Sequence, residues 1–123
     1  MKGIHPNGKA TFTAGAAIAK GEFVKFSSGK VVKAAAATDM CIGVALDSAA
    51  ASGDLIPVQL LTSGDTVLVK SGGEVAQGGS VSCIGTTVSS AGTLQYGYAL
   101  EAATASGQLI ECMVGLPAVT KIS

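Results

Sequence analysis

The sequence has no tryptophan and no arginine, and it has a single histidine, His5. Because His5 lies outside any predicted strand, no Ser/His/Asp or Cys/His relay can be built around a scaffolded imidazole. The acidic residues do not cluster, and Asp47 and Glu101 suit capping or turn roles better than a paired acid and base. Without arginine, and without aromatic residues among the lysines, a nucleic-acid surface is disfavoured as well. The sequence therefore predicts neither an enzyme nor a direct nucleic-acid binder.

Long apolar runs are also missing. No run approaches the roughly 20 residues of a membrane-spanning helix, and no basic segment followed by an apolar one opens the chain. We therefore expect no membrane contact and no export by a signal peptide. The cysteines are odd in number and lack metal-ligand spacing, so we expect no metal and no cofactor. We interpret them as reduced, small core residues: Cys41, Cys83 and Cys112.

An internal repeat is the strongest pattern that is present. Residues 42–56 return as residues 96–110 at an offset of 54, and Asp47 is matched there by Glu101. Upstream, residues 18–24 are echoed by residues 75–81 at an offset of 57. The pattern in each copy predicts a Gly turn, a strand, a loop, a second strand, an Ala/Ser/Gly connection and a last strand.

Short strands separated by turn residues indicate an all-β fold, and 123 residues fit a single domain. We predict a small compact β-barrel or β-sandwich built from two tandem repeats, because periodicity does not choose between the two architectures. Pro57 interrupts a predicted strand, which favours a sheet edge or a bulge at that point. The predicted boundaries are a domain at 16–117, repeat units at about 16–61 and 74–116, a bridging strand at 66–70 and a tail at 118–123.

Residues 1–15 show neither strand nor helix periodicity. We interpret them as an extended, flexible N-terminal arm that orders against a partner, or alternatively as a frayed terminus. Charge also divides the chain: residues 1–33 hold six lysines and one acidic residue, and the remainder holds two lysines and seven acidic residues. Such asymmetry steers a partner or orients identical subunits, unless it is ordinary solvated charge.

Short motifs of Gly, Ala and Val recur in a fixed order along residues 16–116. They are residues 19–24, 42–46, 51–54 with Val58, 75–81 and 97–101. In this order they resemble the capsid decoration or cement proteins of tailed bacteriophages.

The resemblance implies a non-enzymatic structural protein on the virion, made in the host cytoplasm, that binds the outer surface of a phage capsid and stabilises the shell. It implies the major capsid protein as the partner and a homotrimer as the assembly, with no direct contact to nucleic acid or membrane. The body would supply the subunit contacts. The arm residues that would meet the capsid are Lys2, Ile4, His5, Lys9 and Phe12.

A carbohydrate- or receptor-binding β module on a virion surface is the alternative function. Sugar sites need exposed aromatic rings beside polar groups, and alternation along a strand puts Tyr96 and Tyr98 on one face. The other interpretation of these tyrosines is a core or subunit contact. A carrier domain is disfavoured, because residues 38–40, where the modified lysine would be displayed, contain no lysine.

Overall fold

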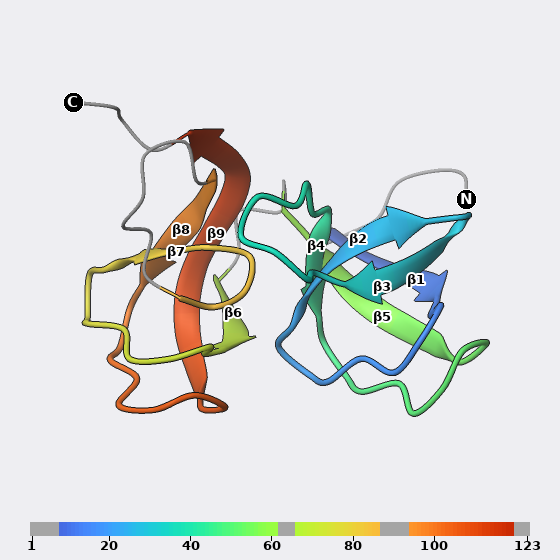
Figure 1. Cartoon of the computed structure of the whole chain (residues 1–123), viewed down its shortest axis with the longest axis horizontal. Helices are drawn as coiled ribbons and strands as arrows, with labels where there is room; N and C mark the ends of the chain where they lie inside the picture. The colour runs from blue at the N-terminus through green and yellow to red at the C-terminus, as the bar shows by residue number, and fades with distance from the viewer. Residues whose placement is uncertain (1–7, 62–65, 87–93, 120–123) are drawn as a thin grey trace.

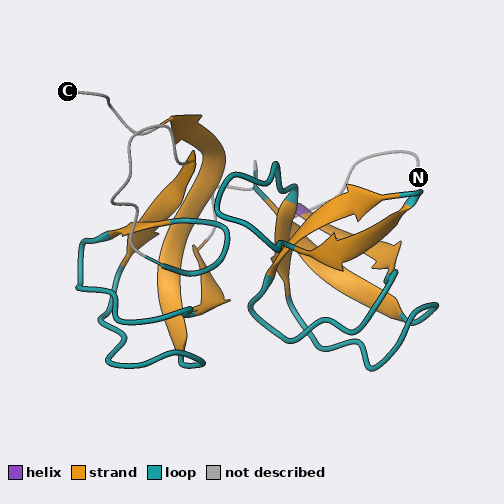
Figure 2. Ribbon diagram, viewed as in Figure 1, coloured by secondary structure: helices purple, strands orange, loops and turns teal. Residues whose placement is uncertain are grey.

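The computed structural model describes residues 8–61, 66–86 and 94–119, and over these residues the fold is all-β (Figure 2). The strands form two antiparallel sheets that lie side by side, the first on the right and the second on the left of Figure 1. The first sheet has the order β1-β5-β4-β2-β3 and the second has the order β6-β9-β8-β7. The bounds are β1 Lys9–Thr13, β2 Phe23–Ser27, β3 Lys30–Lys33, β4 Gly43–Ala45, β5 Leu55–Leu60, β6 Thr66–Lys70, β7 Ser80–Val81, β8 Leu94–Ala99 and β9 Leu109–Val119. The all-β prediction is confirmed, and within the described ranges no helix has the length and apolarity to cross a membrane.

Strand β1 lies within the stretch that the sequence analysis assigns to a flexible arm, so that prediction is wrong for residues 9–13. β1 pairs with β5 along its whole length. Ala10 is buried and Phe12 packs against the first core, while Lys9 is exposed on the other side of the strand. The period-two pattern was missed because Ala10, one of the two inward residues of β1, gives a weak hydrophobic signal. Residues 1–7 lie outside the described residues.

Both sheets curl until segments at their opposite edges meet. In the first sheet a parallel bridge joins Ala14, just after β1, to Val31 of β3, and the Gly15 amide donates to the Val31 carbonyl at 2.7 Å. In the second sheet the Gly72 amide, just after β6, donates to the Gly85 carbonyl at 2.9 Å. Each sheet is therefore curled like a small barrel, and the two pack together as in a sandwich.

The hydrophobic core has two parts. The first lies inside the curl of the first sheet and includes Val24, Val31 and Ile56. The larger part lies between the sheets, where residues from both halves of the chain are buried together. Its members from the first sheet and the adjoining loops are Phe23, Cys41, Val44 and Leu61, and its members from the second include Val67, Val69, Cys83, Tyr96, Ile110 and Cys112. All three cysteines are free and buried, as predicted.

The two halves of the chain, residues 9–61 and 66–119, have matching backbone hydrogen bonds of 2.7 to 3.0 Å. The matched bonds, each written from amide to carbonyl, are Ile18 to Ala49 with Val75 to Ala103, Gly21 to Ala45 with Gly78 to Ala99, Gly53 to Ala14 with Gly107 to Ser71, and Leu46 to Pro57 with Leu100 to Glu111. Partners in each match differ by 57 or 54 positions, which are the two offsets of the sequence repeat. The backbone hydrogen bonds therefore recur at the spacing of the sequence repeat.

Strand β6 has the predicted bounds but not the predicted place. It pairs with β9 in the second sheet, as β1 pairs with β5 in the first, and it lies 57 positions after β1. It is therefore the counterpart of β1 rather than a bridge between units. The predicted tail also begins too early, because β9 continues to Val119 opposite Leu94 of β8. Residues 120–123 lie outside the described residues.

Pro57 is in β5, which is the second strand of its sheet and not an edge strand. Its carbonyl accepts a hydrogen bond from the Leu46 amide at 2.9 Å, and β4 ends one residue earlier, at Ala45. Since proline has no amide hydrogen, the return bond to Leu46 cannot form. The proline therefore lies opposite the end of the neighbouring strand, where a missing donor costs little.

Candidate docking surfaces

The predicted capsid-contacting residues do not form one surface among the described residues. Lys2, Ile4 and His5 lie outside the described residues. Lys9 is exposed and lines an open groove of about 520 Å³ between the sheets. Phe12 turns the other way, into the first core, where its ring meets that of Phe26 edge to face at 5.5 Å.

Tyr96 and Tyr98 lie on opposite sides of the second sheet, so the prediction that they share a face is wrong. Tyr96 is 1% exposed, and its ring lies 5.1 Å from that of Phe23 between the sheets. Tyr98 is 46% exposed on the outer side. The register between β8 and β9 shifts between Gln95 and Gly97, and this irregularity breaks the two-residue alternation on which the prediction relied. Tyr96 is thus a core residue, as the other interpretation had it.

Exposed apolar side chains gather on the outer side of the second sheet. Across the strands Tyr98 lies opposite Met113, and Met113 lies opposite Thr66. Near them Glu111 accepts a hydrogen bond from Thr66 Oγ1 at 2.8 Å. We define the apolar face as Leu68, Tyr98, Leu100, Leu109 and Met113, each between 37% and 48% exposed. Single exposed apolar residues are ordinary, but a group on one sheet face is typical of a surface that contacts another protein.

Sequence reasoning missed the apolar face, although most of its residues lie in strands that it predicted. It did not assign an inner and an outer side to those strands. The signal that could have revealed this face was the repeat itself. Aligning the two halves of the sequence makes Tyr98 the equivalent of Val44 and Met113 the equivalent of Gln59.

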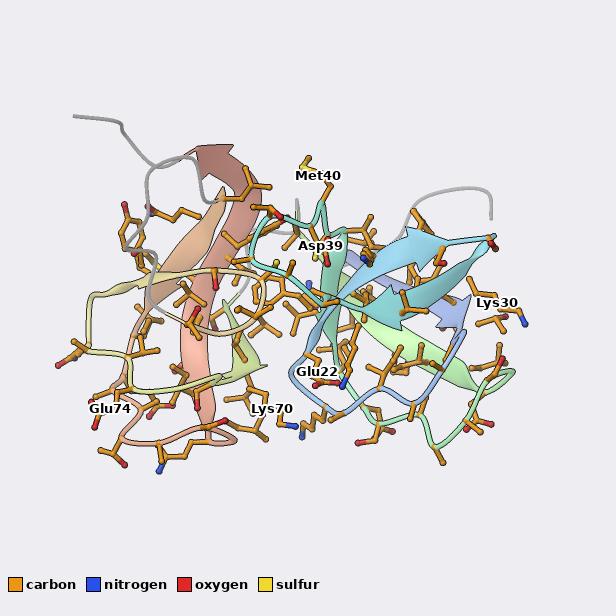
Figure 3. All side chains as sticks on the ribbon, in the orientation of Figure 1. Glu22, Lys30, Asp39, Met40, Lys70 and Glu74 are labelled. Carbon is orange, nitrogen blue, oxygen red and sulfur yellow. The ribbon has the colours of Figure 1, made fainter. Side chains whose placement is uncertain are left out.

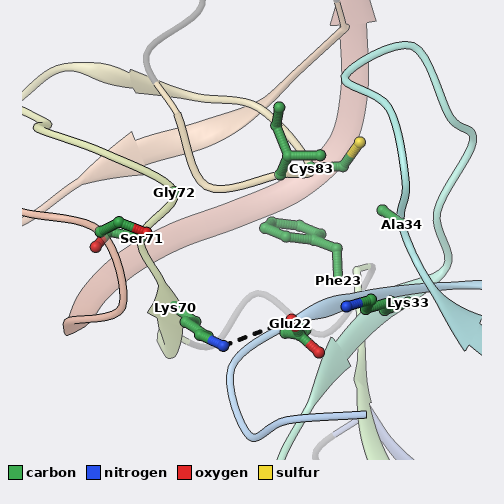
Figure 4. A pocket seen from close by; sticks show the side chains of 10 residues that line it. Glu22, Phe23, Lys33, Ala34, Lys70, Ser71, Gly72 and Cys83 are labelled. Atoms are coloured by element: carbon green, nitrogen blue, oxygen red, sulfur yellow. Dashed lines mark ion pairs between the residues drawn. The ribbon is translucent and has the colours of Figure 1, made fainter. Parts of the chain in front are cut away.

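A smaller cleft of about 200 Å³ lies where the two sheets meet (Figure 4). Glu22 and Lys70 form an ion pair beside it at 3.8 Å, and Phe23 and Cys83 line its wall. Among the described residues, His, Cys, Asp and Glu form no group of three or more that is placed to hold a metal ion. The cleft is best described as part of the packing contact between the sheets.

The loop between β3 and β4 is held in shape by Asp39, which lies at the junction of the two sheets (Figure 3). Its carboxylate accepts hydrogen bonds from the Ala36 amide at 3.0 Å, the Ala35 amide at 2.8 Å and Lys25 Nζ at 3.0 Å. These donors, the Ala36 amide first, lower the pKa of Asp39 to about 2. Its carbonyl in turn accepts a hydrogen bond from the Tyr96 hydroxyl at 2.6 Å. The loop therefore fixes how the first half meets the second.

We expect Asp39→Asn to lower the melting temperature by several degrees at neutral pH and to have little effect near pH 2. Because the folded-state pKa is depressed, the stabilisation is fully present above the unfolded pKa of about 4 and is lost as the pH falls through about 2. Thermal unfolding followed by circular dichroism across this pH range measures how far the melting temperatures of Asp39→Asn and the wild type converge. Asp47→Asn is the matched control, since that carboxylate accepts only from the adjacent Ser48 amide among the hydrogen bonds of the described residues. If Asp39→Asn lowers the melting temperature by the same amount down to the lowest pH, the ionised Asp39 carboxylate does not stabilise the loop as described.

Comparison with known proteins gives a match to a family model and a likeness to solved structures. Residues 2–60 match the family model described as phage cement protein. No curated protein matches the sequence. The crystal structure of the N base of the head fiber gp8.5 of bacteriophage phi29 has a similar fold, with a TM-score of 0.66 and 23% sequence identity, over 87% of this chain and 92% of that chain. At this identity the likeness establishes the fold alone.

Proposed function

Because residues 2–60 place the chain in the phage cement protein family, we propose that this capsid-associated structural protein binds the outer surface of a phage head and stabilises the shell. The family match carries the proposal. The major capsid protein is the partner, the protein assembles as a homotrimer, and it is made in the host cytoplasm. It acts by binding and performs no chemistry.

The charge and apolar surfaces suit a protein that binds through several contacts. Exposed lysines are concentrated on the first half, which also carries the family match: Lys9, Lys20, Lys30 and Lys33. The apolar face lies on the second half, and of these lysines Lys9 and Lys20 line the same groove as Leu68 of that face. A subunit with two kinds of contact surface can bind the shell through one and a neighbour through the other.

Stabilisation of the shell would follow from multivalent binding. A decoration subunit that contacts neighbouring capsid proteins holds them together, because releasing it requires several interfaces to open at once. If the protein binds only the assembled shell, its binding free energy also adds to the stability of that state by mass action.

Co-sedimentation with undecorated capsids tests the proposal. We expect saturable binding of the full chain and weaker binding after deletion of residues 1–7, which removes Lys2, Ile4 and His5 but leaves β1 in place. Deletion of residues 120–123 is the control and should bind like the full chain. Decorated capsids should also release their DNA at a higher temperature than bare capsids. If the full chain binds no capsid at any stage of shell maturation, the proposal is wrong.

The alternative, a carbohydrate- or receptor-binding module on the virion, now depends on one exposed tyrosine, Tyr98, instead of two. Binding of the full chain to immobilised glycans, lost in Tyr98→Ala, would favour it if capsid binding were absent.

A further inference from the structure

The outer side of the first sheet is covered by the second half of the chain. Gln59, Val44 and Phe23 are neighbours across β5, β4 and β2. Each is at most 3% exposed. Val44 and Phe23 belong to the core between the sheets, and the Phe23 ring packs against Tyr96.

The counterpart of this surface in the second half is open. At the offsets of 54 and 57, the equivalent residues are Met113, Tyr98 and Ser80, which are neighbours across β9, β8 and β7. Met113 is 48% exposed and Tyr98 is 46% exposed. The same sheet surface is thus buried in one half of the chain and open in the other, where it forms part of the apolar face.

The second half has a surface against which the first half packs. The counterpart of that surface in the first half is open too. Val69 and Cys83 are buried in the core between the sheets, where the Cys83 thiol donates to the carbonyl of Ala36 in the first half at 3.0 Å. The residues 57 positions earlier are Phe12 and Phe26. Their rings meet edge to face, and Phe26 is 56% exposed. We call these two residues, with the β2–β3 hairpin, the Phe26 surface.

Charge favours contact between these two open surfaces. Exposed Lys30 lies at the outer end of the hairpin of the Phe26 surface (Figure 3), whereas Lys33, at the other end of β3, lines the cleft where the two sheets meet. On the second sheet Glu111 lies among the residues of the apolar face, and the Glu101 carboxylate accepts a hydrogen bond from its amide at 2.7 Å. The ion pairs found among the described residues leave both carboxylates without a lysine. Opposite charges would therefore bring the two surfaces together.

We infer that the apolar face of one copy is covered by the Phe26 surface of a second copy of this chain. The contact between chains has the same direction as the packing between the two halves of one chain. Such a contact is head to tail, so it closes into a ring or extends as a fibre. The inference deepens the self-association within the proposed function, and it is tested on the free protein so that its failure is distinct from a failure of capsid binding.

Light scattering coupled to size-exclusion chromatography tests the contact with one variant on each surface. The wild type should elute as an oligomer, whereas Met113→Glu and Phe26→Glu should each elute with the mass of a single chain. Mixed in equal amounts, they should form a complex of two chains, because the first variant keeps the Phe26 surface and the second keeps the apolar face. Met40→Glu is the matched control, since Met40 is 67% exposed outside both surfaces, and it should leave the oligomer unchanged.

Several outcomes would overturn the inference: a monomeric wild type, either variant keeping the wild-type mass, or a mixture that stays monomeric. A monomeric wild type whose capsid co-sedimentation is abolished by Met113→Glu would instead assign the apolar face to the capsid. Melting temperatures establish that each variant is folded. If Phe26→Glu or Met113→Glu unfolds, Lys30→Glu and Tyr98→Glu replace them. Each should then weaken association at least tenfold, as measured by dilution.

Discussion

Replacing Tyr96 with phenylalanine is expected to lower the free energy of unfolding by about 2 to 3 kcal/mol. The Tyr96 hydroxyl donates to the Asp39 carbonyl at 2.6 Å and accepts from the Cys41 amide at 2.8 Å. Burial raises the pKa of Tyr96, so the hydroxyl is neutral and able to make both bonds. Phenylalanine keeps the ring contact with Phe23 but leaves the Cys41 amide without a partner and the Asp39 carbonyl with only the long contact from the Cys83 thiol at 3.8 Å.

Tyr98→Phe is the matched control for this prediction. The same atom is removed from the same strand, but Tyr98 is 46% exposed and its hydroxyl has no hydrogen-bond partner among the described residues. We expect its stability to stay within about 0.5 kcal/mol of the wild type. Urea denaturation followed by circular dichroism measures both variants. Equal losses at the two positions would show that the Tyr96 hydroxyl does not join the halves.

Gly97→Ala should be the other strongly destabilising substitution, with a loss of about 3 kcal/mol or more. A Cβ at Gly97 would overlap the carbonyl oxygen of Met113 and lie 2.8 Å from the carbonyl carbon of that residue. It would also lie 3.0 Å from Cα of Val114. These are backbone atoms of β9, so no side-chain rotation relieves the overlap, and β8 would have to separate from β9. The counterpart Gly43 meets the Gln59 carbonyl in the same way.

Gly73→Ala provides the control for Gly97→Ala. A Cβ there would meet no atom within 4 Å, and its backbone is not in the left-handed region. We expect the free energy of unfolding to change by less than about 1 kcal/mol, and to increase if alanine restricts the unfolded chain. Soluble yield and denaturation midpoint are the measurements. A Gly97→Ala protein as stable as the wild type would mean that β8 and β9 lie further apart than described.

The short strands could be predicted from the sequence because they depend on local patterns. Thr66–Lys70 has three successive bulky apolar residues between two polar ones, and its bounds were predicted correctly. β1 was missed because its inward positions before Thr13 are Ala10 and Phe12, of which only one is large. Local pattern therefore identifies a strand when its buried residues are bulky and fails when they are small.

The candidate site depended on information that no local pattern holds. Which side of β8 faces the core follows from a register shift against β9, and that shift is a property of the pairing and not of either strand. Strand order is equally non-local, since β1 pairs with β5 and not with its neighbour in sequence. For these reasons Tyr96 and Tyr98 were placed on one face, and the apolar face was not seen.

The position of β9 has a consequence for synthesis of the chain. β9 is the last strand in sequence but an inner strand of its sheet, where it separates β6 from β8. The first sheet has all its strands once Leu60 has been made, whereas the second cannot close until β9 has left the ribosome. We therefore expect the first half to fold during translation while β6 waits without a partner and β7 and β8 can pair only with each other, with their apolar side chains accessible to chaperones. Copies of the protein would then meet only as finished chains, because the apolar face does not exist before β9 is in place.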